Sequence, residues 1–275
     1  MGQSRKLETL EDYKRALKGK YGIGEGADYK PWLRVQDVKS QGIRSQVYGR
    51  KVRRVHHLLS SLESELFYLS EFSDVVIDIR EQFPLLPLNL SHKIAKTIGV
   101  KHPSHPVTNE SIIITTDFLL TIQSSNGIQY QAISVKPESE TNNQRSLEKI
   151  DIERIWWELL GINFKLYIGN KLTRAQSRNI SWATSPFREQ LAIFSDVQVE
   201  QALYVLRVGK NFIHEICDCF IREKIVSHLE ALTLLRYFIA DRFIEVDLSF
   251  NIEEAGILDI TQVLLNQRGV GNGNC

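Results

Sequence analysis

One charged residue inside an apolar segment constrains the fold of this chain more than any other feature. Asp117 stands in the run SIIITTDFLLTI, which has the β-branched composition of a buried strand. A carboxylate in a central strand is costly unless it is paired or binds a metal. Nineteen residues later, Lys136 ends the run YQAISVK, directly before Pro137. If these two strands are neighbours, Asp117 and Lys136 lie at the same end of one sheet.

The segments around this pair predict a mixed sheet flanked by helices. Apolar residues spaced three and four apart over Val55–Phe72 predict an amphipathic helix. Four short alternating or β-branched runs predict strands, and a helical pattern separates the last two. The predicted strands are Val75–Arg80, Ser111–Gln123, Tyr130–Lys136 and Phe164–Ile168, and the predicted helix is Arg145–Leu160. This order is typical of an α/β domain, which we place at residues 1–168.

A second domain is expected after a polar segment. Residues 169–188 (GNKLTRAQSRNISWATSPFR) are loop-like in composition and predict a linker. Residues 189–265 then predict a mainly helical, winged-helix-like domain, and the Gly/Asn-rich residues 266–275 predict a disordered tail. The predicted helices are Val197–Val208, Phe212–Ser227 and Leu229–Ala240, and the predicted strands are Ile244–Phe250 and Ile257–Ile260.

The composition of the 275 residues narrows the class of protein. Apolar residues make up 43% and charged residues 24% of the chain, as in ordinary globular proteins. No apolar run approaches the ~20 residues that cross a bilayer, so no membrane association and a cytoplasmic location are expected. The three cysteines are Cys217, Cys219 and Cys275, an odd number without paired ligand spacing, which favours neither disulfides nor zinc.

The charge is concentrated near the N-terminus. Residues 1–60 carry 14 Lys/Arg against 6 Asp/Glu, whereas residues 198–275 carry 7 against 11. The run GRKVRRVHH is the electrostatic footprint of a phosphate-binding surface, although a merely solvated basic face fits the composition equally well. The two adjacent histidines point to different faces, so one of them is expected to be structural. The candidate DNA contacts are Arg50, Lys51, Arg53, Arg54, His56 and His57.

The chemistry of the candidate site is that of phosphodiester hydrolysis. Glu63 lies on the helix that precedes the strands, and with Asp117 it forms an acidic pair that could hold Mg²⁺. Lys136 could orient the attacking water or offset phosphate charge. The spacing alone is weak evidence, because an ordinary ion pair between Asp117 and Lys136 at the strand ends explains it as well.

Several segments resemble proteins of the TnsA family and follow one another in the same order as in that family. They are YKPWLRVQDV, GRKVRRVHHLLSSLE, DIREQFPLLP, TTDFLL, AISVKP and RSLEKIDIER. The resemblance is dense over roughly residues 20–160 and thin beyond. It implies a restriction-endonuclease-like core of the PD-(D/E)xK kind for the first domain.

The resemblance also implies roles for individual residues. Glu63 and Asp117 match metal-binding carboxylates, and Lys136 matches the catalytic lysine. Ser134 stands where the family usually has Glu or Gln, so water or the backbone carbonyl of Val135 is expected to complete the metal shell. The implied cofactor is Mg²⁺, with Mn²⁺ expected to substitute. Glu153, on the helix after the lysine strand, is a further candidate carboxylate.

The function implied by the resemblance is cleavage of the 5′ ends of a transposon. The implied partners are double-stranded DNA at the transposon ends, a TnsB-type DDE transposase and a TnsC-type AAA+ ATPase, with the protein at the nucleoid when assembled. The acidic second domain is expected to bind a protein partner rather than DNA. Two alternatives stay open: a stand-alone restriction or repair-type nuclease, and a catalytically weak scaffold that bridges the transpososome.

Overall fold

The computed structural model describes residues 4–38, 42–189 and 194–264. The chain divides into two compact units, Met1–Gly169 and Asn170–Cys275. The predicted tail 266–275 lies outside the described residues. None of the helices in the described ranges has the length and apolarity needed to span a bilayer.

The first unit is built on a four-stranded sheet in the order β3-β4-β5-β6. Strand β3 (Val76–Pro84) pairs antiparallel with β4 (Thr115–Ser124), and β4 forms a hairpin with β5 (Gly127–Val135). Strand β6 (Asn163–Tyr167) runs parallel to β5, which requires the crossover that helix α4 (Gln144–Leu159) provides. The prediction of a mixed sheet flanked by helices is confirmed.

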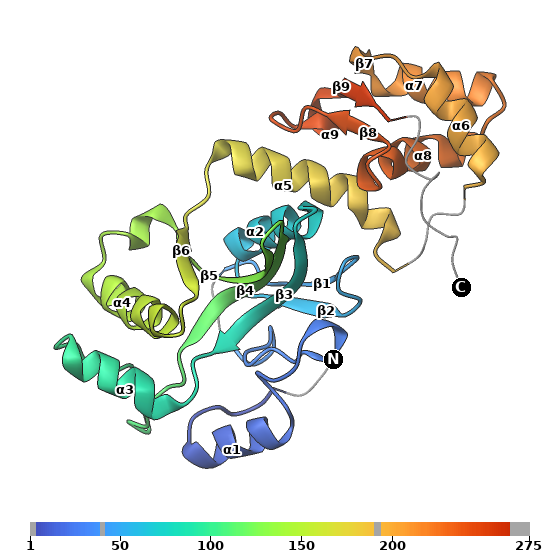
Figure 1. Cartoon of the computed structure of the whole chain (residues 1–275). Helices are drawn as coiled ribbons and strands as arrows, with labels where there is room; N and C mark the ends of the chain where they lie inside the picture. The colour runs from blue at the N-terminus through green and yellow to red at the C-terminus, as the bar shows by residue number, and fades with distance from the viewer. Residues whose placement is uncertain (1–3, 39–41, 190–193, 265–275) are drawn as a thin grey trace. The chain divides into compact units, whose positions relative to one another are not determined.

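Helices cover both faces of this sheet (Figure 1). Helix α2 (Ser61–Phe72) packs on one face, where Phe67 meets Phe118 and Leu120. Helices α3 (Leu88–Thr97) and α4 pack on the other face, where Leu119 and Ala132 meet Trp156 and Trp157. Successive residues of β4 thus alternate between two cores, which is why the strand reads as a nearly continuous apolar run.

The N-terminal part of the unit corrects one prediction. It contains α1 (Leu10–Lys18), the 3₁₀ turn η1 (Gly26–Asp28) and a hairpin of β1 (Ser45–Tyr48) with β2 (Val55–Leu58). The predicted helix Val55–Phe72 is therefore wrong at its start, because Val55–Leu58 is a strand. Ser60 caps the helix by accepting a hydrogen bond from the backbone of Glu63, so the helix begins only at Ser61.

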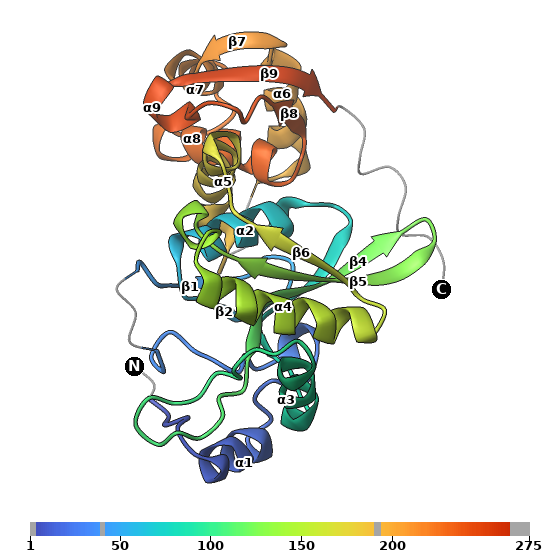
Figure 2. The same ribbon diagram turned by 90° about the vertical axis from the view of Figure 1, so that its left-hand side faces the viewer.

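The second unit combines helices with a small antiparallel sheet (Figure 2). The sheet has the order β7-β9-β8, and its assignment to the winged-helix class stays a prediction. The predicted helix Phe212–Ser227 ends early, at Arg222. The described helices are α5 (Lys171–Thr184), the 3₁₀ turn η3 (Ser185–Phe187), α6 (Asp196–Val205), α7 (Ile213–Arg222), α8 (His228–Ala240) and α9 (Ile252–Ala255). The strands are β7 (Gly209–Phe212), β8 (Ile244–Val246) and β9 (Ile257–Val263).

Helix α5 replaces most of the predicted linker 169–188. A capping box between Asn170 and Thr173 starts the helix, and Ile180 and Ala183 are buried on one side of it. The polar residues that predict a loop lie on the exposed face of an amphipathic helix. Its buried face also carries Asn179, whose amide bonds the loop before α9.

The role of Asn179 can be tested through stability. Its amide donates to the carbonyls of Leu248 and Phe250 at 3.0 and 2.6 Å and accepts from the backbone N–H of Ile252 at 3.0 Å. Replacing it by alanine leaves three backbone groups without these partners, each costing roughly 1–3 kcal/mol. We expect Asn179→Ala to lower the free energy of unfolding by about 3 kcal/mol or more in urea denaturation, and the exposed neighbour Arg178→Ala to change it little. Equal effects of the two substitutions would contradict this role.

Candidate active site

The sheet brings Asp117 and Lys136 together at one end. Asp117 lies on β4, and Lys136 follows directly after β5, the neighbouring strand. The Lys136 ammonium lies 3.3 Å from Asp117 Oδ2 and donates to the carbonyl of Val135 at 2.9 Å. The backbone N–H of Val135 donates to the same carboxylate oxygen at 2.7 Å. Asp117 is thereby fixed through Oδ2, while its other oxygen, Oδ1, accepts from the side-chain amide of Gln82 at 3.2 Å.

Glu63 reaches this site from α2. Its carboxylate accepts hydrogen bonds from the N–H of Leu59 at 2.9 Å and from the hydroxyl of Ser60 at 3.0 Å, both at the start of the helix. The side-chain amide of Gln82 connects it to the sheet, because Nε2 lies 3.2 Å from Glu63 Oε2 and 3.2 Å from Asp117 Oδ1. The two predicted carboxylates therefore share one amide group between them.

Ser134 and Glu153 extend the site toward α4. The Ser134 hydroxyl accepts from the Lys136 ammonium at 3.2 Å and lies 3.5 Å from Asp117. Glu153, 4% exposed, hydrogen-bonds the hydroxyls of Thr116 and Ser134. Within the described part of the chain, Glu153 Oε1 has no hydrogen-bond partner. A buried carboxylate oxygen without a partner is costly, so this position favours a bound cation or a proton.

The electrostatics of the site follow from crowding buried carboxylates. Burial and the charge of Asp117 raise the pKa of Glu63 to about 8. Burial and the same charge raise the pKa of Glu153 to about 8. Burial alone would lower the pKa of Lys136, but the surrounding acids outweigh it and keep the ammonium charged. One ammonium thus faces three acidic groups. A further positive charge at the site would therefore reduce the repulsion between these acids.

The residues present fit a hard divalent cation by the chemistry of their donors. Mg²⁺ prefers oxygen ligands, and Glu63, Asp117 and the Val135 carbonyl all offer oxygen. Over the described ranges, no three His, Cys, Asp or Glu side chains are grouped closely enough to form a metal site by themselves. Neutral oxygens from the protein or from water would therefore have to supply part of a coordination shell here.

Two of the predicted DNA contacts are buried instead. Arg54 is 8% exposed and His56 is fully buried. The Arg54 guanidinium binds both carboxylate oxygens of Glu81 at 2.8 and 2.6 Å, and His56 Nδ1 lies 2.9 Å from the same carboxylate. The prediction of phosphate contacts is wrong for these two residues, because their polar groups are used inside the fold.

Glu81 is the acid on which this buried network depends. Burial would raise its pKa, but His56 and the Arg54 guanidinium outweigh burial and hold the pKa of Glu81 well below its usual range. The backbone N–H of His57 donates to it as well, at 3.0 Å. Gly49 lies close to this network, since a Cβ there would come within 2.7 Å of His56 Nε2. Part of the run GRKVRRVHH therefore stabilises the fold by bonding the buried Glu81 carboxylate.

The other basic candidates differ in exposure. His57 is half-buried, and its Nδ1 accepts from the backbone N–H of Val35 at 3.3 Å. Burial lowers the pKa of His57. The Lys51 ammonium donates to the carbonyls of Ser73 and Val76. The side chain of Arg53 is exposed, whereas Arg50 is half-buried.

Sequence reasoning missed Gln82, although its segment was singled out. In the run DIREQFPLLP, the alternating charges of Asp78, Arg80 and Glu81 predict an ion-paired sheet edge in preference to direct DNA contact, and the structure shows an Asp78–Arg80 ion pair at 3.3 Å on edge strand β3. That strand continues to Pro84, beyond its predicted end at Arg80. A neutral glutamine among charged residues gives no signal by composition. Its role emerges only when β3 and α2 meet around Asp117.

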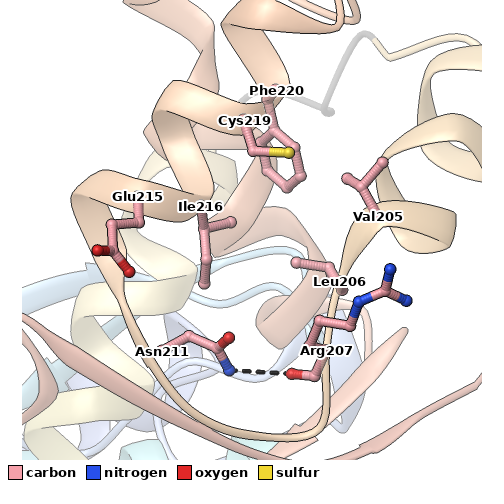
Figure 3. Close-up of a pocket in the computed structure, with 8 residues that line it drawn as sticks. All are labelled: Val205, Leu206, Arg207, Asn211, Glu215, Ile216, Cys219 and Phe220. Atoms are coloured by element: carbon pink, nitrogen blue, oxygen red, sulfur yellow. Dashed lines mark hydrogen bonds between the residues drawn. The ribbon is translucent and has the colours of Figure 1, made fainter.

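The second unit contains two surface pockets in its described part. The smaller, of about 110 Å³, lies between the end of α6 and α7 (Figure 3). Asn211 closes one side of it by donating to the carbonyl of Arg207 at 2.9 Å, and Cys219 and Glu215 line the α7 side. The larger, of about 390 Å³, is lined by Glu200, Gln201, Tyr204, Val205, Glu223 and Ile225. Neither pocket contains the acid and lysine groups that phosphodiester chemistry needs.

Comparison with known protein families identifies the class to which the first unit belongs. Residues 73–169, which include Asp117 and Lys136, match the family described as TnsA-like endonuclease N terminal. The first unit is therefore an endonuclease core of the restriction-endonuclease-like class.

A full-length comparison extends the match to both units. The chain is 34% identical over 256 residues to the transposon Tn7 transposition protein TnsA of Escherichia coli, covering 91% of each protein. The chain belongs to the TnsA family.

The buried network around Glu81 predicts a clear difference between adjacent arginines. Arg54→Ala leaves a buried carboxylate without its guanidinium, which should lower the free energy of unfolding at pH 7 by about 3–5 kcal/mol. Because the pKa of Glu81 is depressed in the fold, this stabilisation is present above pH 4.5, its ordinary pKa, and is lost as the pH falls further. The exposed Arg53→Ala should change stability by less than about 0.5 kcal/mol. Chemical denaturation of both variants measures this, and similar losses would contradict it.

The raised carboxyl pKa values predict how stability depends on pH. Glu63 and Glu153 have ordinary pKa values of 4.5 and folded values of about 8, so the folded protein binds more protons between these limits. The free energy of unfolding should therefore fall as the pH rises through this window, by up to about 1.4 kcal/mol per pH unit for each group.

Denaturation in EDTA at pH 6, 7 and 8 measures this slope. Glu63→Gln should make the slope shallower, because the amide stays neutral. The exposed Glu138→Gln should leave the slope unchanged. An unchanged slope in Glu63→Gln would show that Glu63 titrates normally.

Proposed function

We propose that this protein is a Mg²⁺-dependent DNA endonuclease that cleaves the 5′ ends of a transposon. We propose further that it acts with a TnsB-type DDE transposase and a TnsC-type AAA+ ATPase. The observation that carries the nuclease chemistry is the ammonium of Lys136 beside Asp117, with Glu63 joined to Asp117 through one amide group. The place in transposition is supported by the likeness to a protein named for transposition.

In this proposal the acidic residues hold the cation. Asp117 and Glu63 each offer a carboxylate oxygen on the side where Gln82 now donates to both. The carbonyl of Val135 and water complete the shell. Mg²⁺, when bound, activates the attacking water and offsets charge on the phosphate. Mn²⁺ has the same ligand preference and is expected to substitute.

Lys136 is the group proposed to meet the reacting phosphate or water. Its ammonium stays charged because the three acids around it outweigh the cost of burial. The hydrogen bonds to Asp117, Ser134 and the Val135 carbonyl hold it at the end of the sheet. A fixed ammonium at this point stabilises the negative charge that develops during hydrolysis without a reorganisation of its surroundings.

DNA contact is proposed for the part of the basic segment that reaches the surface. Arg53 is exposed and is the first candidate. Arg50 and Lys51 lie beside it in the turn between β1 and β2, are half-buried, and the Lys51 ammonium already donates to the carbonyls of Ser73 and Val76. His57 is only half-buried and is a further candidate. Arg54 and His56 are left out, since both are buried against Glu81. Phosphate contacts of this kind position a duplex without reading its sequence, so the site of cleavage is proposed to be set by the partner transposase.

The second unit is proposed to bind a protein partner. Its acidic balance argues against strong contact with phosphates. It presents the larger pocket, whose rim carries Glu200 and Glu223 beside Tyr204, which is 81% exposed. An exposed aromatic residue between acids suits a basic, partly apolar partner surface. A winged-helix-like fold for this unit and a cytoplasmic, nucleoid-associated location belong to the same proposal.

Strand-specific cleavage of transposon-end DNA tests the function. In Mg²⁺, with the cognate transposase and ATPase present, the wild-type protein should cut the 5′ strands. Asp117→Ala and Lys136→Ala should each reduce cutting by about 10²-fold or more. Lys149→Ala, an exposed lysine on α4, is the matched control and should cut normally.

Each other outcome rejects a definite part of the proposal. Cutting by this protein alone would identify a stand-alone restriction or repair-type nuclease. Normal cutting by Asp117→Ala would place the active site elsewhere. No cutting under any condition, with partners bound, would identify a bridging scaffold.

A further inference from the structure

Gln82 occupies a position that the roles given so far do not explain. It lies on β3 and is 2% exposed. Its backbone has φ +50°, which is unusual for a residue other than glycine. Residues two apart in a strand normally point to the same face of the sheet. Glu81 and Phe83 instead point to opposite faces, because Glu81 bonds Arg54 and His56 whereas Phe83 packs in the core under α4. The turn at Gln82 thus breaks the alternation of the strand.

The surrounding structure holds this unusual backbone in place. The carbonyl of Gln82 accepts from the N–H of Trp32 at 3.2 Å and from the hydroxyl of Tyr29 at 3.4 Å. Both residues belong to the N-terminal segment and are 2% exposed or less. Strained conformations that persist under such support are concentrated at functional sites.

The strained turn places the Gln82 side chain between the two metal-binding candidates. Its amide group lies 3.2 Å from one oxygen of Glu63 and 3.2 Å from one oxygen of Asp117. The other end of the amide accepts from the hydroxyl of Thr115 at 3.0 Å. A group that touches one oxygen from each of two carboxylates is at the point where a shared cation would be bound.

The amide of Gln82 can present oxygen instead of nitrogen at that point. Rotation by half a turn about its last side-chain bond exchanges the two atoms. Thr115 accommodates either arrangement, because a hydroxyl both donates and accepts hydrogen bonds. In this structure the N–H groups face the carboxylates, and after such a rotation the carbonyl oxygen would face the same place.

Ser134 is poorly available for the same task. Its hydroxyl accepts from Lys136, bonds Glu153 and lies 3.5 Å from Asp117. The Gln82 amide, by contrast, hydrogen-bonds one oxygen of Glu63 and one oxygen of Asp117. Among the hydrogen bonds of the described residues, no other side chain joins these two acids.

We propose that Gln82 is a ligand of the divalent cation and supplies a neutral amide oxygen beside Glu63 and Asp117. This inference rests on the proposed metal-dependent function. It accounts for the strained backbone, since the turn at Gln82 orients this side chain of edge strand β3 toward both Glu63 and Asp117. It also explains how a site with few clustered acidic side chains holds a hard cation.

Direct Mn²⁺ binding tests the proposal without DNA or partners. The full chain is titrated with Mn²⁺, and free ion is followed by electron paramagnetic resonance to give Kd. Gln82→Ala should raise Kd by about 10-fold or more, within the range typical of groups that support a metal site. Gln82→Glu, which keeps an oxygen and loses the N–H donor, should bind at least as tightly as wild type. Gln123→Ala, an exposed glutamine on β4, should have no effect.

The glutamate variant separates a ligand from a mere hydrogen-bond donor. If Gln82 only holds the two carboxylates by donating to them, Gln82→Glu should weaken binding as much as Gln82→Ala, and this result would overturn the proposal. Unchanged binding in Gln82→Ala would overturn it too. Thermal unfolding in EDTA checks that the variants fold; if Gln82→Ala does not, the Kd of Gln82→Glu alone decides.

Asp117→Ala distinguishes failure of this inference from failure of the proposed function. If Asp117→Ala loses Mn²⁺ binding while Gln82→Ala keeps it, the metal site stands and the role of Gln82 is rejected. If wild type does not bind Mn²⁺, or Asp117→Ala binds it equally well, the proposed metal site itself is rejected, and the role of Gln82 with it.

Discussion

Electrostatic repulsion between buried carboxylates is the constraint around which the first unit is organised. Asp117, Glu63 and Glu153 come from a strand and two helices on opposite faces of the sheet, and Lys136 is the ammonium that they share. In water these acids would be ionised at neutral pH, whereas here two of them have pKa values near 8. Burying such a cluster lowers the free energy of unfolding. Clusters of this kind are typical of functional sites that bind charged groups, such as those that act on phosphates.

The N-terminal segment supports this cluster from behind. Trp32 and Tyr29 bond the backbone of β3 at Gln82, and the Arg54–Glu81 pair fixes the residue before it. The basic character of the segment is thus divided between two tasks. Part of it neutralises a buried acid next to the site, and part of it, including Arg53, faces solvent. A count of charges cannot distinguish the two, because burial depends on what packs against each side chain.

Much of the fold was readable from local pattern. The strands around Asp117 and Lys136 are predicted from short β-branched and apolar runs, and the helices α4 and α8 from apolar residues that recur every three to four positions. The errors fell where local pattern is ambiguous. Val55–Leu58 continues the apolar spacing of α2 but pairs with β1, and the polar face of α5 resembles a loop.

The sequence by itself determined the class of the sheet and the family, because these depend on short-range periodicity and on motifs spread along the first unit, and it placed Asp117 and Lys136 on successive predicted strands. Only the tertiary structure decided which basic residues are buried, that Glu153 is a buried acid beside Ser134, and that Gln82 lies between Glu63 and Asp117. Each of these depends on contacts between segments far apart in the chain. The backbone turn at Gln82 shows the reason most clearly: its strained φ is held by Trp32 and Tyr29, fifty residues earlier, and nothing in the residues beside it predicts that support.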